Sequence, residues 1–242
     1  MILNGKKLKN IPFTDPRGHC GESGQLHIST DTKGRSFLVK SNPADVTNEF
    51  VVHRLAQIIG VPTSDAALID NRGFIEVGIV YEKDFKRASI DDFIGDAKYP
   101  DDSPYLADFV SFLALRDLVA MGDNHQLAFA RNHLISYDYA DSFFLSDSTY
   151  GVMCLLNDLS IPISAFSNNI LIRHELESML RILQRPKTDF LVDAYCDTLF
   201  SFMDADLTPI LNDLKAVFPA VVPAFYEACF DIMRDAIDEL AE

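Results

Sequence analysis

The two halves of this chain follow different hydrophobic periodicities, and this contrast limits the folds open to it. Residues 1–85 alternate short apolar runs with turn residues, and the runs at 25–30 and 36–40 flank a turn that ends in glycine. From residue 105 onwards the apolar residues recur at helical spacing, and the segment 107–121 is apolar on nearly every side. We therefore expect an α+β protein with a small β-rich lobe and a helical lobe.

The boundary between the two lobes is expected at residues 86–104. This segment is rich in aspartate and proline and contains few apolar residues suited to a core. It would be a hinge between an N-lobe formed by residues 1–85 and a C-lobe formed by residues 105–242. This two-lobed plan is that of protein kinases.

Local signals predict the elements of each lobe. The N-lobe should contain one helix that is capped by Thr47 or Asn48 and ended by Gly60, followed by strands at 66–70 and 74–81. The expected elements of the C-lobe are the buried helix 107–121, a strand pair at 133–137 and 143–146, and helices at 170–184, 190–203 and 208–240, the last broken near Pro219 or Pro223.

Composition narrows the class of protein. The chain has 242 residues, of which 48% are apolar, so it can bury a substantial core. Its apolar runs are too short to cross a membrane, and its N-terminus has no apolar leader segment. The four cysteines are scattered, a pattern typical of reduced thiols. We therefore expect a cytoplasmic globular protein with no membrane contact.

The net charge of −15 argues against a nucleic-acid partner, because nucleic-acid binding relies on lysine and arginine at the phosphates. The charge is uneven, however. The first 40 residues carry seven lysines and arginines against three acidic residues, while the last 60 are rich in aspartate and glutamate. A basic front is consistent with an anionic ligand, although an acidic solvated helical face alone would also explain the C-terminal part.

Candidate functional residues occur in the order that an ATP-dependent phosphotransferase requires. A glycine-bearing turn comes first, then a lysine at the end of an apolar strand, a glutamate in the following helix, an aspartate after the buried helix, and a later aspartate. The residues are Gly21, Glu22, Ser23, Gly24 and Gln25 in the turn, then Lys40, Glu49, Asp123 with His125, Asn132 and Asp147. Their order carries the argument, because no single one is specific.

Phosphoryl transfer needs positioning and charge neutralisation, and each residue has a matching role. Lys40 would pair with the α- and β-phosphates, and Glu49 would hold that lysine in place. Asp123 would accept the proton of the acceptor hydroxyl, supported by His125. Each residue also has a purely structural alternative: a lysine at a strand end, an acidic residue in a first helical turn, or a capping turn.

The metal ligands follow from the same chemistry. Asp147 would bind Mg²⁺, which prefers oxygen ligands, and Asn132 would be the second ligand. Turns at strand ends, made by the short polar side chains of aspartate and asparagine, are the structural alternative for both. Asp138 and Asp141 are predicted to be turn residues. Tyr81 and Glu82, which follow the strand at 74–81, complete the expected nucleotide-binding set.

The segment NEFVVHRLAQIIGVPTSDAALI, residues 48–69, resembles the helix-and-strand segment of HipA-like serine/threonine kinases. Three shorter matches extend the resemblance over about residues 20–150. GESGQ at 21–25 is similar to the S-x-S-G-x-Q phosphate loop, GDNH at 122–125 to the D-x-H catalytic motif, and FLSDSTYG at 144–151 to the Y-D-x-x-S metal-binding segment. The chain is shorter than full-length HipA and resembles the compact members.

The resemblance implies a serine/threonine protein kinase that uses ATP and Mg²⁺, with a protein substrate and an antitoxin-like partner. Ser23 would be a site of autophosphorylation. The family pattern places asparagine five residues after the catalytic aspartate, where this chain has Ala128. A four-residue insertion at 126–129 would bring Asn132 into register as the second metal ligand.

Two other functions remain open at this stage. A nucleotide-binding pseudokinase or interaction module would keep the fold without transferring phosphate, and the displaced Asn132 motivates this alternative. A small-molecule phosphotransferase could use the same residues.

Overall fold

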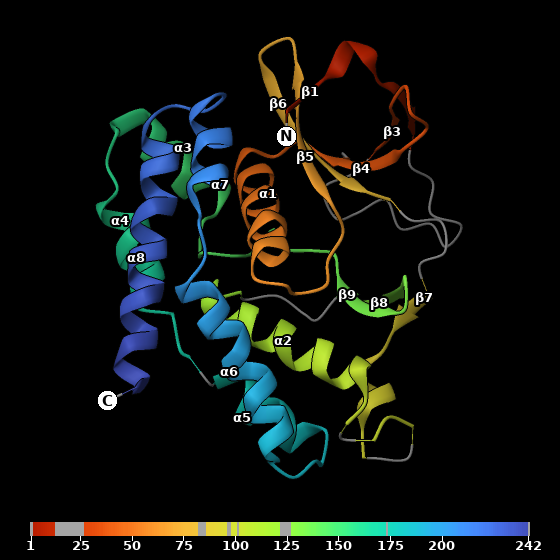
Figure 1. Cartoon of the computed structure of the whole chain (residues 1–242). Coiled ribbons are helices and arrows are strands. Elements are labelled where there is room, and N and C mark those ends of the chain that lie inside the picture. The colour runs from red at the N-terminus through yellow and green to blue at the C-terminus, as the bar shows by residue number, and fades with distance from the viewer. Residues whose placement is uncertain are drawn as a thin grey trace.

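The structure is a computed structural model, and the residues that it describes are 2–12, 27–81, 86–95, 98–100, 102–121, 127–172 and 174–241. Its N-terminal part is a sheet and its C-terminal part is helical, which confirms the predicted α+β architecture (Figure 1). None of the helices in these ranges combines the length and apolar character needed to cross a membrane.

The N-terminal part is built on one six-stranded sheet. The strand order is β1-β5-β6-β4-β3-β2, and all neighbouring strands are antiparallel except β1 and β5. The strands are β1 (Ile2–Asn4), β2 (Lys9–Pro12), β3 (His27–Thr30), β4 (Ser36–Lys40), β5 (Ala66–Asn71) and β6 (Phe74–Val80), with the short helix η1 (Gly5–Lys7) after β1. The expected hairpins β3–β4 and β5–β6 are present.

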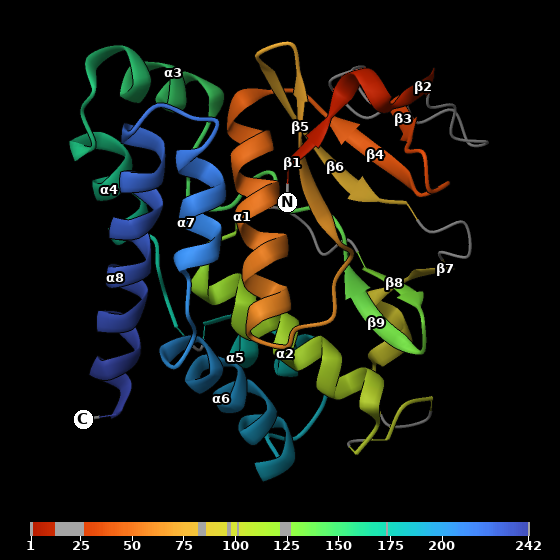
Figure 2. The same cartoon turned by 45° about the horizontal axis from the view of Figure 1, so that its top comes forward.

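Helix α1 (Pro43–Ile58) packs against this sheet through contacts with β5 and β6 (Figures 1 and 2). Its start was predicted wrongly. Asn42 is the N-cap and Pro43 occupies the first turn, where its missing N–H is not needed. Thr47 therefore lies inside the helix, and its hydroxyl donates to the carbonyl of Ala44. Gly60 follows the helix with a φ of 80°, as expected.

The C-terminal part is mainly helical. Its helices are α2 (Pro104–Leu118), α3 (Asp147–Leu156), α4 (Ser160–Ser167), α5 (His174–Ile182), α6 (Asp189–Met203), α7 (Thr208–Lys215) and α8 (Val221–Ala241). The long C-terminal helix predicted from the sequence is broken before α8, around Pro219, as expected. Helices α3 and α4 were not predicted.

A three-stranded sheet lies beside the helices, in the order β7-β8-β9. Its strands are β7 (Lys86–Ala88), β8 (Leu127–Ala130) and β9 (His133–Ser136). The segment 86–104, expected to be a linker, therefore contributes a strand, and it also contains the short helix η2 (Ile90–Phe93). The predicted strand at 143–146 is wrong. Phe143 and Phe144 have φ values of 60° and 52°, which an extended strand does not allow.

Apolar side chains of the six-stranded sheet form a second, smaller core on the face opposite α1. Phe37, Val39 and Ile69 are buried there. Gly78 in β6 lies against them, because a Cβ atom at this position would be 2.8 Å from the Cδ1 of Ile69 and 3.2 Å from the Cβ of Phe37. A methyl group added at this position would force the side chains of Ile69 and Phe37 to move.

We expect Gly78→Ala to lower the free energy of unfolding by about 1–3 kcal/mol, because the methyl group overpacks this core. Gly151→Ala in α3 is the matched control. A Cβ at 151 meets no atom within 4 Å, so the substitution should raise stability by about 0.5–1 kcal/mol through helix propensity. Urea denaturation of both variants measures the effects, and a stabilising Gly78→Ala would contradict the packing described here.

Candidate active site

Five of the predicted site residues lie in the part of the chain that the structure describes: Lys40, Glu49, Tyr81, Asn132 and Asp147. The others lie outside the described residues, so their roles stay predictions. These are Gly21, Glu22, Ser23, Gly24, Gln25, Glu82, Asp123 and His125.

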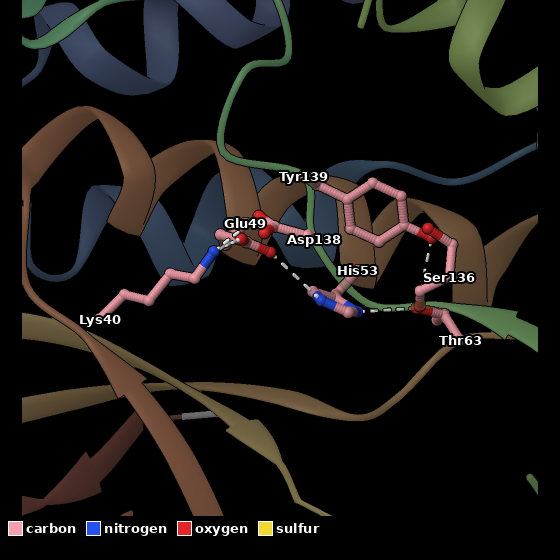
Figure 3. Close-up of polar contacts among 7 residues, drawn as sticks. All are labelled: Lys40, Glu49, His53, Thr63, Ser136, Asp138 and Tyr139. Atoms are coloured by element: carbon pink, nitrogen blue, oxygen red, sulfur yellow. Dashed lines mark hydrogen bonds and ion pairs between the residues drawn. The ribbon is translucent and has the colours of Figure 1, made fainter. Parts of the chain in front are cut away.

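Lys40 lies at the centre of a cluster of charged side chains (Figure 3). It is the last residue of β4, and its Nζ forms an ion pair with Glu49 Oε1 from α1. The same Nζ donates to Asp138 Oδ1 at 2.7 Å. Asp138 lies two residues beyond the end of β9. One ammonium therefore joins the six-stranded sheet, its helix and the segment that leaves the second sheet.

Burial and charge together shift the pKa values of these groups. Burial alone would raise the pKa of the fully buried Glu49, but the Lys40 ammonium and contact with His53 outweigh it and lower this pKa to about 2. Burial alone would lower the pKa of Lys40, but the carboxylates of Glu49 and Asp138 raise it. Burial and the nearby Glu49 charge raise the pKa of Asp138 to about 6. Lys40 and Glu49 are therefore both charged at neutral pH.

A chain of polar contacts begins at the carboxylate oxygen of Glu49 that does not pair with Lys40 (Figure 3). His53, one turn later in α1, places Nε2 3.3 Å from Glu49 Oε2, close enough for an ion pair but not aligned as a hydrogen bond. Its Nδ1 is 2.7 Å from Thr63 Oγ1, which donates to the carbonyl of Ser136 at 3.2 Å. The ring of Tyr139 meets the imidazole edge-on at 4.7 Å. These contacts fix α1 against the end of β9.

Asn48 in α1 holds the segment that follows Asp138. Its buried amide donates to the carbonyl of Ala140 at 2.6 Å and to that of Leu145 at 3.3 Å. The amide oxygen accepts a hydrogen bond of 2.9 Å from the hydroxyl of Tyr226 in α8. The capping residue expected from the sequence is thus a buried link between α1, residues 140–145 and α8.

We expect Asn48→Ala to lower the free energy of unfolding by about 1–3 kcal/mol, because it leaves buried polar partners unpaired. It should also accelerate amide hydrogen exchange in residues 138–145, which lose their anchor. Thr198→Val is the control, since it removes a different side-chain hydrogen bond, to the carbonyl of Ala194 one turn earlier in α6. This control should destabilise the protein without changing exchange at 138–145, and equal exchange in both variants would contradict the anchoring role.

Comparison with known proteins bears on the fold. No family model and no curated protein sequence matches the chain. Among solved structures, the crystal structure of the Helicobacter pylori proinflammatory kinase CtkA aligns with a TM-score of 0.64 and covers 97% of this chain and 95% of its own. The chain has a kinase-like fold. The sequences are 12% identical over this alignment.

A second solved structure that aligns with the chain is the HipA, HipB and operator DNA complex of Shewanella oneidensis MR-1. The TM-score is 0.48 and the identity 11%, and the alignment covers 95% of this chain and 63% of that one.

Asn132 and Asp147, the two predicted metal ligands, lie in different parts of this fold and are not brought together. Asn132 and Arg131 form the two-residue turn of the β8–β9 hairpin, with φ values of 65° and 50°. Residues 127–129, the part of the supposed insertion that the structure describes, belong to β8 instead of a loop that bulges out. Six residues of mostly extended chain, about 20 Å, separate Asn132 from Asp138 at the other end of β9.

Asp147 is the first residue of α3, and its Oδ1 accepts a hydrogen bond of 3.0 Å from the backbone N–H of Ala44. It thus joins the first turns of α3 and α1. Figures 1 and 2 both show α3 far from the β8–β9 hairpin. Tyr81 directly follows β6, and its backbone N–H donates to the carbonyl of Ser36 at 2.8 Å.

Sequence reasoning missed Asp138, which it took for a turn residue. A signal was available, because Tyr137 and Asp138 form the Y-D pair with which the family's metal-binding motif begins. The segment assigned to that motif, 144–151, lacks this pair. Asp138 is also the residue that the structure places against Lys40.

Protein kinases use a nucleotide and a divalent cation, and the residues at Lys40 can be tested for both. A buried ammonium held by a carboxylate suits a phosphate group. Mg²⁺ is commonly held by one or two carboxylates together with phosphate oxygens, so Asp138 would suffice as one protein ligand. Among the described residues no group of three or more metal-binding side chains occurs, and the second ligand expected at Asn132 is not brought to this site.

Proposed function

We propose that this protein is an ATP-dependent phosphotransferase whose acceptor is a serine or threonine hydroxyl of a protein. The observation that carries the proposal is the position of Lys40, which ends β4 between Glu49 of α1 and Asp138 beyond β9 in a kinase-like fold. Protein kinases need these three parts: a strand lysine, a helix glutamate that holds it, and an aspartate for the metal.

Each residue has a defined task in the proposed reaction. Lys40 binds the α- and β-phosphates, and Glu49 fixes the position of its ammonium. Asp138, rather than Asp147, would hold Mg²⁺, which neutralises charge on the phosphates when it is bound. The γ-phosphoryl group passes to the acceptor hydroxyl, ADP leaves, and Asp123 takes the hydroxyl proton. The role of Asp123 rests on its sequence motif.

The hairpin register is compatible with the roles proposed for Asp123 and Asp138. Leu127, the first residue of β8, pairs with Ser136, the last residue of β9. The chain therefore enters the hairpin from segment 122–126 at the same end from which it leaves towards Asp138. A proton acceptor and a metal ligand must lie at one site, and this register is consistent with that requirement.

A pseudokinase that binds nucleotide without transferring phosphate is the second candidate. Ala128, which stands where the family pattern has the second metal ligand, is buried in β8 and has no side-chain oxygen to offer. Asn132 occupies the hairpin turn instead. One metal-binding carboxylate with Lys40 could bind Mg²⁺ and ATP yet transfer phosphate slowly or not at all.

Radiolabelled ATP distinguishes the two candidates. The purified chain with ATP and Mg²⁺ should label itself, with Ser23 as the expected position, and Asp123→Asn should abolish labelling while nucleotide binding persists. Nucleotide binding without any labelling would establish the pseudokinase. Labelling of a small metabolite but of no protein would favour a small-molecule phosphotransferase.

An antitoxin-like partner is a further expectation, to be tested by co-purification with the products of neighbouring genes.

A further inference from the structure

Helices α3 and α4 expose an apolar surface to solvent. Val152, Leu155 and Leu156 of α3 are 43%, 83% and 63% exposed, and Ile161 of α4 is 60% exposed. The three α3 residues are spaced three and four apart, so they lie on one face of the helix. Exposed apolar side chains that gather on one face mark a binding surface more often than scattered ones do.

The two helices enclose a hollow that continues this face. It is an open depression with a volume of about 160 Å³. Val152 and Ile161 line it together with Ser148 and Asp158. The hollow is separate from the candidate active site, since neither Lys40 nor Asp138 lines it. The α3–α4 surface, defined as Val152, Leu155, Leu156, Ile161 and this hollow, thus has both an apolar face and a depression to receive a side chain.

Charge around the α3–α4 surface selects its partner. Residues 147–167, which form α3, α4 and their connection, contain two aspartates and no lysine, arginine or histidine. Asp147 at the start of α3 and Asp158 beside the hollow are exposed. Helix α8, which packs against both helices, carries one arginine, and Asp231 pairs with it. The surface therefore repels anionic partners and attracts cationic ones.

The same charge argues against a second copy of this chain as the partner. A symmetric dimer would bring each patch against its equal, with Asp158 and Asp147 facing the same acidic residues. Like charges in such a contact are unfavourable, and the chain as a whole carries −15.

We propose that the α3–α4 surface binds a cationic amphipathic helix of a partner protein. Apolar side chains of that helix would cover Leu155, Leu156 and Ile161 and enter the hollow, while its lysines or arginines would face Asp147 and Asp158. This is the helix-in-groove mode of recognition, in which apolar anchors recur at helical spacing. The proposal does not depend on phosphoryl transfer.

The test uses the full chain and a fluorescein-labelled 18-residue peptide of leucine and lysine at amphipathic helical spacing. Fluorescence anisotropy should show binding, and the double variant Leu155→Ser/Ile161→Ser should bind at least 10-fold more weakly. Phe200→Ser is the matched control, because Phe200 is an exposed apolar residue on α6, and it should bind within twofold of wild type. A peptide with glutamate in place of lysine should not bind.

A second pair of variants tests the charge. Asp158→Asn keeps the side-chain oxygen that accepts from the N–H of Ser160, and it should weaken peptide binding about threefold or more at low salt. Asp197→Asn, an exposed aspartate on α6, should not. Absence of peptide binding, or equal binding by wild type and the Leu155/Ile161 variant, would overturn the proposal. A wild-type dimer in sedimentation that the Leu155/Ile161 variant converts to monomer would overturn it in favour of self-association.

Discussion

Lys40→Met is expected to reduce phosphoryl transfer by about 100-fold or more, because it removes a positioned cation from the phosphates. The variant should also lose about 3–5 kcal/mol of unfolding free energy at neutral pH, since it leaves the buried carboxylate of Glu49 without its counter-ion. Activity and stability would therefore fall together, and a second variant is needed to separate them.

The double variant Lys40→Met/Glu49→Gln makes that separation. It removes both buried charges, so most of the lost unfolding free energy should return, while transfer and nucleotide affinity should remain low. Urea denaturation and nucleotide titration of the two variants measure these effects. Recovery of transfer in the double variant would show that Lys40 has a structural role alone.

The pH dependence of Lys40→Met follows from the same pair. In the wild type the pKa of Glu49 is lowered, so the stabilisation it provides is present above its ordinary value of 4.5 and is lost as the pH falls towards 2. Without Lys40, burial raises the pKa of Glu49, so the carboxylate destabilises the fold most at high pH. The stability deficit of the variant should be larger at pH 8 than at pH 5.

Asp138→Asn is expected to reduce Mg²⁺-dependent transfer by at least about 100-fold, because a charged metal ligand contributes several kcal/mol to the transition state. The fold should persist, since Lys40 keeps its ion pair with Glu49. A higher Mg²⁺ concentration for half-maximal nucleotide binding would locate the defect at the metal.

Asp147→Asn is the matched control. The sequence predicts Asp147 as a metal ligand and Asp138 as a turn residue, whereas the proposal based on the structure assigns the metal to Asp138. The asparagine keeps an oxygen that can accept from the Ala44 N–H, so transfer should change by less than about threefold. The reverse result, with Asp147 essential and Asp138 dispensable, would restore the assignment made from the sequence.

The sequence predicted what is local and missed what depends on tertiary pairing. The hairpins and the Lys40–Glu49 pair follow from turn residues and from the short spacing between a strand end and the next helix. Asp138 reaches Lys40 only because β9 pairs with β8 and Thr63 bridges to Ser136, contacts between residues far apart in the chain. No periodicity in the sequence encodes such contacts.

Local conformation explains the other errors. Aromatic residues favour strands, so Phe143 and Phe144 indicated one, but both adopt positive φ. The backbone N–H of Phe143 donates instead to the carbonyl of Val119. Thr47 and Asn48 are good capping residues, yet Pro43 starts the helix four residues earlier. In each case the preference of a residue type was overridden by packing or by a neighbouring proline.

Asn48 and Glu49 are consecutive residues of α1, and this adjacency links the two attachments that they make. They point about 100° apart around the helix axis, one towards the segment after Asp138 and the other towards Lys40. A rotation of α1 that separates Glu49 from Lys40 would therefore also strain the hydrogen bonds of Asn48, since both side chains turn with the helix. Because the hydroxyl of Tyr226 in α8 donates a hydrogen bond to Asn48, the position of the C-terminal helix is coupled to the position of α1. A substitution or ligand that displaces α8 is therefore expected to disturb the Lys40–Glu49 pair as well.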